Sequence, residues 1–389
     1  MSKEFSPDIK LICGDPGGAN ALVPVILQLH SEKKEQIQVF AYRQAADIFL
    51  KKNISFSSLD EQTTYSEILD FLKGNRPKII VTGTSFDPIG LEVKFIHAAR
   101  ILKIPSLSLL DYWCLYSLRF SENEGDLKYV PDKIAIMDEM AYSDMITEGF
   151  HPDTLIITGQ PAFDALAEFK SSFSNQKWEQ IRSYFHIHSY ELFIVFVSEP
   201  LSIFFGEDES NPQFLGYTEI SVINQLITAL EQISQDCNKH IALLIRPHPR
   251  EKTDVYEKIT SNNIRIIVSK EGNPRDIVMA SDLVIGMTTE LLVEACYLGC
   301  IVVSLQPELR FKDVLPTNNN GFSIPVYSKE KIYDTLKKAL IDPYIRSEMK
   351  KKVEQFKHDG HATNRIVNII YQMMVETDSN GEHYDKIGN

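Results

Sequence analysis

Short apolar segments alternate with amphipathic ones over the first 158 residues of the chain. The apolar segments have the length expected of strands that a parallel sheet buries on both faces. They lie at 10–13, 38–42, 78–82, 106–110, 133–137 and 155–158. Within the segment 90–102, residues Leu91, Phe95, Ala98 and Leu102 fall on one face of a helix. This alternation predicts βαβ units and a parallel sheet.

A second series of the same kind begins at Leu192, after a polar stretch at 169–188. Apolar residues at helical spacing follow over 220–233. Further strand-like runs begin at Ile241, Ile264, Leu283 and Ile301. A long helical pattern then covers 344–375, and the segment after it has too few apolar residues to pack. At 389 residues, length and pattern together predict two domains.

We therefore predict an α/β fold with two Rossmann-like domains, the first over 1–168 and the second over 189–345. A closing helix over 346–375 is expected to cross back to the first domain. We expect residues 376–389 to form a flexible tail. The two sheets are expected to face each other across a cleft.

Two strand-like runs of the second domain end in polar loops. The run 241–245 is followed by Arg-Pro-His-Pro-Arg-Glu at 246–251, and the run 282–285 by Gly-Met-Thr-Thr-Glu at 286–290. In an open α/β sheet, ligands bind outside the carboxyl ends of the strands, where loop amides and helix N-termini meet anions. The sequence therefore predicts a phosphate-bearing ligand at this edge.

Charge and composition limit the class of partner. The chain has 40 Lys and Arg against 53 Asp and Glu, a net charge of −13, so the broad basic surface of a nucleic-acid binder is missing. A small nucleotide in a local basic pocket is compatible with this charge. The five scattered cysteines form no CxxC pair and suit reduced core thiols. We find no signal-like or membrane-spanning apolar run and expect a cytoplasmic protein.

Several segments resemble the two-domain glycosyltransferases of the GT-B fold and their relatives, the UDP-N-acetylglucosamine 2-epimerases and the CDP-glycerol polyol-phosphate transferases. The resemblance lies in segments 14–20, 157–164, 246–249, 287–299 and 358–367. It implies two Rossmann-like domains, a nucleotide-sugar donor in the second, and no bound metal. Gly14, Gly17 and Gly18 miss the GxGxxG spacing, so no dinucleotide cofactor is expected.

The loop 287–290 departs from both relatives. The epimerases' paired glycines and paired glutamates are replaced by Thr288 and Thr289, with only Glu294 in register, which argues against an epimerase. The polyol-phosphate transferases usually have Asp-Tyr-Ser-Ser here, which argues against that reaction too. Glu290, in the first helical turn, would repel a donor pyrophosphate unless it pointed away.

The predicted donor site combines cations, hydroxyls and helix amides. Its residues are Arg246, His248, Gly286, Thr288, Thr289 and Glu294. A departing diphosphate gains negative charge, and Arg246 and His248 are placed to stabilise it, with His248 in a catalytic role. The alternative for the Pro-His-Pro loop is a rigid turn. For the two threonines it is helix capping. For Glu294, which in the family would accept from ribose hydroxyls, it is a solvated helix carboxylate.

The first domain is expected to hold the acceptor and supply the general base. Asp15 is the first candidate and Asp111 the second. Both residues follow strand-like runs. Gly17 and Gly18 allow a ligand to approach the backbone closely, and Trp113 suits sugar stacking. The alternatives are an Asx-turn or helix cap for Asp15 and interface packing for the aromatic residues.

The sequence thus predicts a glycosyltransferase that moves a sugar or sugar-like unit from a nucleotide donor to a saccharide or glycoconjugate acceptor, in surface polysaccharide or glycoconjugate synthesis. Two alternatives stay open. One is a sugar-nucleotide epimerase or hydrolase, or a polyol-phosphate transferase, on the same fold. The other is a non-catalytic sugar-nucleotide binding protein. The donor base, the acceptor, the stereochemical outcome and the oligomeric state are not determined by the sequence.

Overall fold

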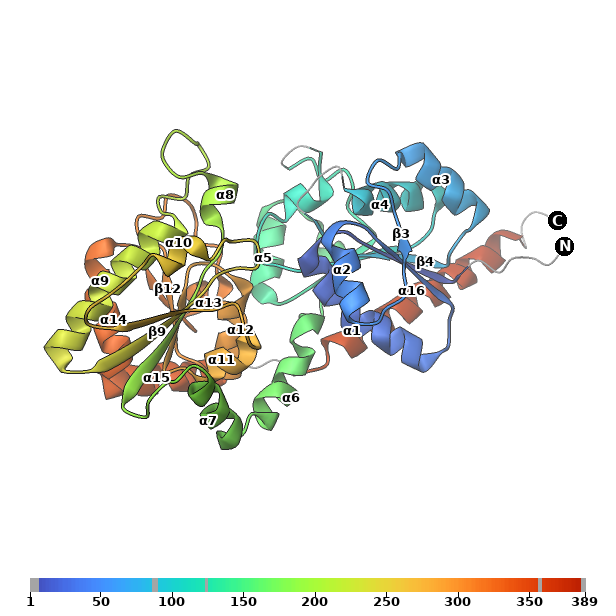
Figure 1. The fold of residues 1–389 in the computed structure, drawn as a ribbon. Helices are drawn as coiled ribbons and strands as arrows, with labels where there is room; N and C mark the ends of the chain where they lie inside the picture. The colour runs from blue at the N-terminus through green and yellow to red at the C-terminus, as the bar shows by residue number, and fades with distance from the viewer. Residues whose placement is uncertain (1–6, 86–89, 123–124, 356–358, 386–389) are drawn as a thin grey trace. The chain divides into compact units, whose positions relative to one another are not determined.

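The computed structural model comprises two compact units (Figure 1). It describes the chain except residues 1–6, 86–89, 123–124, 356–358 and 386–389 and the side chains of 377–385. The first unit contains residues 1–165 and 359–389, and the second contains residues 166–358. Each unit has its own sheet and its own apolar core.

The first unit is built on a seven-stranded sheet in the order β3-β2-β1-β4-β5-β6-β7, and every pairing is parallel. Ile9 is in register with both Ile37 and Ile79, which places β1 between β2 and β4. The strands are β1 (Ile9–Cys13), β2 (Ile37–Ala41), β3 (Ser57–Ser58), β4 (Ile79–Thr82), β5 (Ser106–Leu109), β6 (Lys133–Ile136) and β7 (Leu155–Ile157).

Helices cover both faces of this sheet, because successive strand residues point to opposite sides. Leu11 packs in one apolar cluster with Leu22 and Ile366, whereas Ile12 packs in another with Phe95. The helices are α1 (Pro16–Glu32), α2 (Arg43–Lys51), α3 (Tyr65–Gly74), α4 (Leu91–Leu102), α5 (Glu139–Thr147) and α16 (Ala362–Asp385), with short 3₁₀ turns η1 (Ser117–Phe120), η2 (Pro152–Thr154) and η3 (Pro161–Phe163).

The second unit has a six-stranded parallel sheet in the order β10-β9-β8-β11-β12-β13. The strands are β8 (Glu191–Val197), β9 (His240–Arg246), β10 (Arg265–Val268), β11 (Leu283–Gly286), β12 (Val302–Leu305) and β13 (Ile324–Val326). The helices are α6 (Asp164–Ser172), which begins at the boundary, α7 (Asn175–Tyr184), α8 (Leu201–Phe205), α9 (Glu219–Cys237), α10 (Asp254–Glu257), α11 (Pro274–Ala280), α12 (Glu290–Leu298), α13 (Pro316–Asn319), η4 (Lys329–Lys331), α14 (Ile332–Ile341) and α15 (Pro343–Gln355).

Helix α9 shows how local sequence sets these elements. Thr218 caps its N-terminus by accepting from the backbone amide of Ser221, and the Ser221 hydroxyl accepts from the amide of Thr218. Apolar residues at helical spacing, among them Val222, Leu226 and Leu230, are buried in the core of the second unit. Asn238, in the left-handed conformation, ends the helix.

The two parallel sheets confirm the predicted fold class, and some details differ from the sequence-based expectation. The polar stretch 169–188 contains α7 and the end of α6. The single closing helix expected from residue 346 is two helices, with α15 in the second unit and α16 in the first. The backbone of α16 stays helical to Asp385, where a flexible tail was expected. Within the described residues, no helix has both the length and the apolar character needed to cross a membrane.

The C-terminal helix is fixed to the first unit by Asp164. The two carboxylate oxygens accept from the backbone amides of Ala362, at 3.1 Å, and Thr363, at 2.7 Å, and from the Thr363 hydroxyl at 2.5 Å. Arg365, one turn into α16, donates to the carbonyl of Thr158 at 2.7 Å. Two segments about 200 positions apart in sequence therefore form one hydrogen-bonded cluster.

Replacing Asp164 with alanine should destabilise the protein by about 1–3 kcal/mol, because the first amides of α16 lose their acceptor in a partly buried position. The melting temperature of Asp164→Ala, compared with that of Asp47→Ala at an exposed position of α2, measures this effect. Equal melting temperatures for the two variants would show that the α16 amides find other partners.

Candidate functional site

In both sheets the strand order changes direction at the first strand. β1 lies between β2 and β4, and β8 lies between β9 and β11. In open α/β sheets of this topology, ligands bind outside the carboxyl ends of the strands at this point. A ligand site is therefore expected at the loops after β1 and β4 in the first unit, and at those after β8, β9 and β11 in the second.

A buried glutamate holds the loop after β1. Glu92, in the first turn of α4, is 3% exposed and accepts from the amide of Gly14 at 2.7 Å and from the hydroxyl of Tyr42. A Cβ added at Gly14 would lie 2.2 Å from the Tyr42 ring, so this position requires glycine. Burial raises the pKa of Glu92 to about 7. Sequence reasoning missed Glu92, because a glutamate in a first helical turn is common.

Asp15 and Asp111, the predicted bases, differ in their surroundings. Asp15 is the N-terminal residue before α1 but makes no side-chain cap hydrogen bond, and its carboxylate lies 3.8 Å from Arg43. Asp111 forms an ion pair with the buried Arg119 and accepts from the Thr84 hydroxyl at 2.8 Å. Asp111 is therefore tied to its neighbours, whereas Asp15 is the more open carboxylate.

The predicted acceptor-side glycines lie where space is short. A Cβ on Gly17 would lie 1.9 Å from the carboxylate of Asp111, and one on Gly18 would lie 3.1 Å from the backbone nitrogen of Thr84. The loops after β1, β4 and β5 thus meet at these two glycines. Trp113 differs from expectation: it is 3% exposed, and its indole N–H donates to Asp138 at 2.8 Å. The indole is therefore not exposed to solvent, as a platform for sugar stacking would be.

Glu251 orders the loop after β9. Its carboxylate accepts from the backbone amide of His248 at 2.5 Å, from the Ser198 hydroxyl at 2.9 Å and from the Tyr256 hydroxyl at 2.6 Å. The Lys270 ammonium donates to the carbonyls of Pro249, at 3.2 Å, and Glu251. These hydrogen bonds hold the backbone of the Pro-His-Pro loop, and with it His248, in place.

One ring nitrogen of His248 is engaged within its own loop. Its Nδ1 accepts from the backbone amide of Arg250 at 3.1 Å, which leaves the proton of the neutral ring on Nε2. Burial, with the charges of Arg250 and Lys270, lowers the pKa of His248. The ring is therefore neutral near pH 7 and acts as a donor rather than as a cation.

The two arginines of this loop, Arg246 and Arg250, differ in their surroundings. Arg246 is partly buried and donates to the carbonyls of Glu271, at 2.7 Å, and Gly272, at 3.0 Å, so it braces the loop before α11. Arg250 is exposed, and its guanidinium lies 5.9 Å from the centre of the Phe204 ring. Arg250 stands in the same motif, but the sequence offered no means of ranking the two arginines.

The N-terminus of α12 is occupied by a carboxylate that the sequence did not point to. Glu199, which follows β8, accepts from the backbone amide of Thr288 and, at 3.1 and 3.2 Å, from its hydroxyl. Thr289 is the residue before α12, but its side chain makes no cap hydrogen bond. A Cβ on Gly286 would lie 2.9 Å from the carbonyl of Val197, so glycine lets β8 and β11 approach each other here.

Glu294 is paired rather than solvated. Arg275, in the first turn of α11, donates to both its carboxylate oxygens, at 2.9 and 2.5 Å. The Glu294 side chain is only 12% exposed. Thr288 and Thr289 thus lie just before α12 and Glu294 lies in its middle, with Arg275 as a neighbour that sequence reasoning missed.

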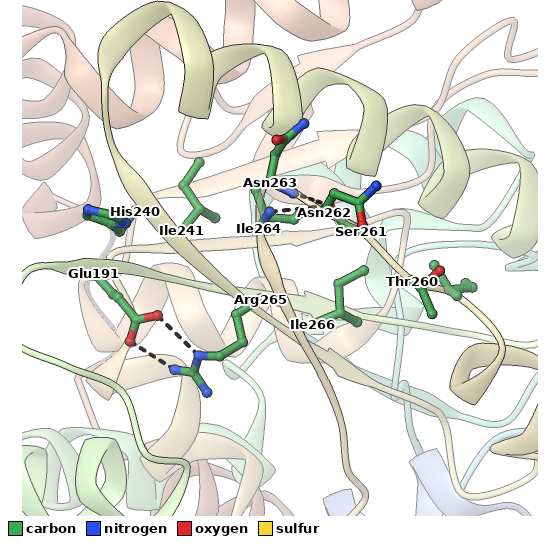
Figure 2. A pocket seen from close by; sticks show the side chains of 11 residues that line it. Glu191, His240, Ile241, Thr260, Ser261, Asn262, Asn263, Ile264, Arg265 and Ile266 are labelled. Carbon is green, nitrogen blue, oxygen red and sulfur yellow. Dashed lines mark hydrogen bonds and ion pairs between the residues drawn. The ribbon is translucent and has the colours of Figure 1, made fainter.

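A hollow in the second unit lies away from these loops. About 530 Å³ in volume, it is lined by residues that include Glu191, His240 and Arg265, the first residues of β8, β9 and β10 (Figure 2). It thus lies at the amino edge of the sheet, opposite the loops described above, and two of its lining residues, Arg265 and Glu191, form an ion pair. Among the described residues, no group of three or more His, Cys, Asp or Glu side chains could hold a metal ion.

Several solved structures share this fold over nearly the whole chain. A UDP-GlcNAc 2-epimerase from Neisseria meningitidis, bound to UDP-GlcNAc, aligns with a TM-score of 0.65 at 16% identity, covering 94% of this chain and 99% of that one. S. aureus MnaA with UDP gives 0.66 at 18% identity, covering 93% and 95%. Acinetobacter baumannii MurG gives 0.60 at 14% identity, covering 94% and 100%.

No protein-family model and no curated protein matches the sequence. The structural likeness shows that the chain has the GT-B fold, which confirms the fold and the resemblance that the sequence segments indicated. At identities of 10–18%, the likeness shows the fold alone. It does not distinguish glycosyl transfer from epimerisation.

Replacing Glu92 with glutamine should change how stability depends on pH. The pKa of Glu92 rises from 4.5 to about 7 on folding, so its contribution to stability is complete below pH 4.5 and is lost as the pH rises to about 7. Glutamine does not titrate. The melting temperature of the parent relative to Glu92→Gln should therefore fall between pH 4.5 and 7 and stay level above pH 7. Glu139→Gln, at an exposed position, should show no such trend. Parallel curves for parent and Glu92→Gln would contradict the assignment.

Proposed function

We propose that the protein is a glycosyltransferase that moves a sugar or sugar-like unit from a nucleotide donor to a saccharide or glycoconjugate acceptor, in surface polysaccharide or glycoconjugate synthesis. The carrying observation is the second sheet's direction change, where β8 and β11 are neighbours and the N-terminus of α12 follows β11. Amides and hydroxyls at such a point suit a diphosphate. Two of the similar structures were solved with UDP or UDP-GlcNAc, which supports a nucleotide sugar as the ligand.

On the donor side, His248 and Arg250 would stabilise the leaving diphosphate. His248 offers an Nε2–H from a loop that Glu251 holds rigid, so little reorganisation is needed when charge develops. Arg250 adds an exposed positive charge beside it. Thr289 supplies a hydroxyl at the start of α12 that makes no cap hydrogen bond. We place Glu294 near the donor, held by Arg275.

On the acceptor side, Asp15 is the proposed general base, with Asp111 second. Asp15 makes no cap hydrogen bond and belongs to a loop that Glu92 fixes through Gly14. Asp111 is engaged by Arg119 and Thr84, which suits a residue that positions the loop.

The main alternative is a sugar-nucleotide epimerase or hydrolase, because UDP-GlcNAc 2-epimerases are among the similar structures. A polyol-phosphate transferase or a non-catalytic sugar-nucleotide binding protein would use the same donor loops. Turnover separates these functions. A transferase consumes the nucleotide sugar only with an acceptor, an epimerase or hydrolase consumes it without one, and a binding protein consumes none.

The deciding experiment is a thermal-shift screen with UDP, CDP, GDP, CMP and their sugars, followed by turnover of the best ligand with and without added saccharide acceptors. A ligand that binds only the folded state raises the melting temperature. A nucleotide sugar that stabilises the protein and is consumed only with an acceptor is the expected result. No shift with any nucleotide would refute the proposal.

His248→Ala should lower turnover on the order of 10²-fold, the usual loss when one electrostatic donor to a developing charge is removed. The matched control is His240→Ala, which removes an exposed histidine from the amino end of the same strand and should keep parental turnover. A loss of less than about 3-fold in His248→Ala, under 1 kcal/mol, would leave the histidine with a role in the turn alone.

Asp15→Asn should lower the turnover rate while nucleotide affinity stays close to the parent's, because a base acts on the acceptor only in the transition state. Asp111→Asn is measured beside it, and melting temperatures are recorded for both. We expect the melting temperature to fall in Asp111→Asn, which weakens a buried ion pair, and to stay near the parental value in Asp15→Asn. Parental turnover in both variants would show that neither Asp15 nor Asp111 is the general base.

A further inference from the structure

The donor-phosphate position of the proposed function is already taken by a carboxylate of the chain. β8 and β11 are in register at Val197 and Gly286, so Glu199 and Thr288 each lie two residues past the paired positions. The Glu199 carboxylate therefore accepts from the Thr288 amide and hydroxyl. It lies at the N-terminal end of α12, where the helix dipole favours negative charge. Backbone hydrogen bonding extends to the amide of Thr289.

We propose that Glu199 occupies the diphosphate site when no donor is bound, and that donor binding neutralises this carboxylate by proton uptake. The inference rests on the proposed function and concerns how its donor site is controlled. It follows from charge: a diphosphate at the amides of Thr288 and Thr289 would lie beside an ionised Glu199, and two adjacent anions repel each other.

The surroundings of Glu199 favour the neutral form. The loop after β9 contributes the carboxylate of Glu251, whose like charge raises the pKa of Glu199, and the segment before α9 contributes the hydroxyl of Tyr217. The loop before α12 contributes Thr288 and Thr289 as donors, which favour the charged form. Among the described residues, none of the largest influences on the pKa of Glu199 comes from a cation. Desolvation is the largest, and the pKa of Glu199 is raised to about 7.

Protonation and donor binding are therefore linked. With its pKa raised to about 7, Glu199 is expected to be partly neutral near pH 7, and a bound diphosphate should raise the neutral fraction further. Affinity should be greatest below pH 6 and should fall about tenfold per pH unit above pH 7, the limit for uptake of one proton. A nucleotide sugar is the informative probe, because its diphosphate carries no proton that titrates in this range.

The experiment measures binding of UDP-GlcNAc, or the nucleotide sugar that the thermal-shift screen selects, to the full-length protein at pH 6, 7, 8 and 8.5. Calorimetry at each pH in two buffers of different ionisation enthalpy counts the protons taken up. The parent should take up between about 0.5 and 1 proton per ligand at pH 7–8 and lose about 10-fold or more in affinity between pH 7 and 8.5.

Glu199→Gln keeps an acceptor for the Thr288 amide but cannot ionise. It should bind the probe at pH 8.5 about 10-fold more tightly than the parent, with no proton uptake attributable to residue 199. Glu257→Gln, an exposed position on α10, should behave as the parent does. Melting temperatures show that each variant is folded.

The outcomes separate the two proposals. Binding with the same pH dependence and the same proton uptake in the parent and Glu199→Gln overturns the role of Glu199 and leaves the proposed function standing. Binding that is weaker in Glu199→Gln at every pH would show that the charged carboxylate helps the donor, which also overturns the inference. Failure of the parent to bind any nucleotide or nucleotide sugar overturns both.

Discussion

The interaction on which both units depend is the hydrogen bond from a loop amide to a glutamate carboxylate. When a parallel strand ends, the next backbone amides lose their partners in the sheet and need another acceptor. Glu92 accepts from Gly14, Glu251 from His248, and Glu199 from Thr288. Each bond sets the conformation of a loop at the carboxyl edge of its sheet, which is where the site residues lie.

This arrangement explains why an acidic chain is compatible with an anionic ligand. The net charge is −13, but Glu92, Glu251 and Glu199 accept hydrogen bonds from backbone amides. These three carboxylates face the backbone rather than the open surface. Burial raises the pKa of Glu92 and of Glu199 to about 7, so the charge at both sites changes near neutral pH. Stability and donor affinity are therefore expected to depend on pH in the same range.

The sequence predicted those features that depend on local pattern. Strand-like runs such as 192–197 match β8, and the polar loops after β9 and β11 lie at the expected edge of the sheet. Contacts between distant residues were not predictable. Glu294 and Arg275 are 19 residues apart, and their pairing depends on how α11 and α12 pack. A tryptophan is a residue type that can stack on a sugar, but Trp113 is buried and donates to Asp138. That contact joins residues 25 positions apart and could not be read from the sequence.

The choice of glutamate over a hydroxyl residue has a consequence for the site. Serine or threonine at position 199 would also offer the Thr288 amide an acceptor, but a hydroxyl neither titrates near pH 7 nor repels a phosphate. A carboxylate fills the anion position while the site is empty, so the amides are never left without an acceptor. Under the proposed function, the same carboxylate must be neutralised before a diphosphate can bind. Glutamate thus preserves the loop and makes donor binding sensitive to protons, a combination that no uncharged cap provides.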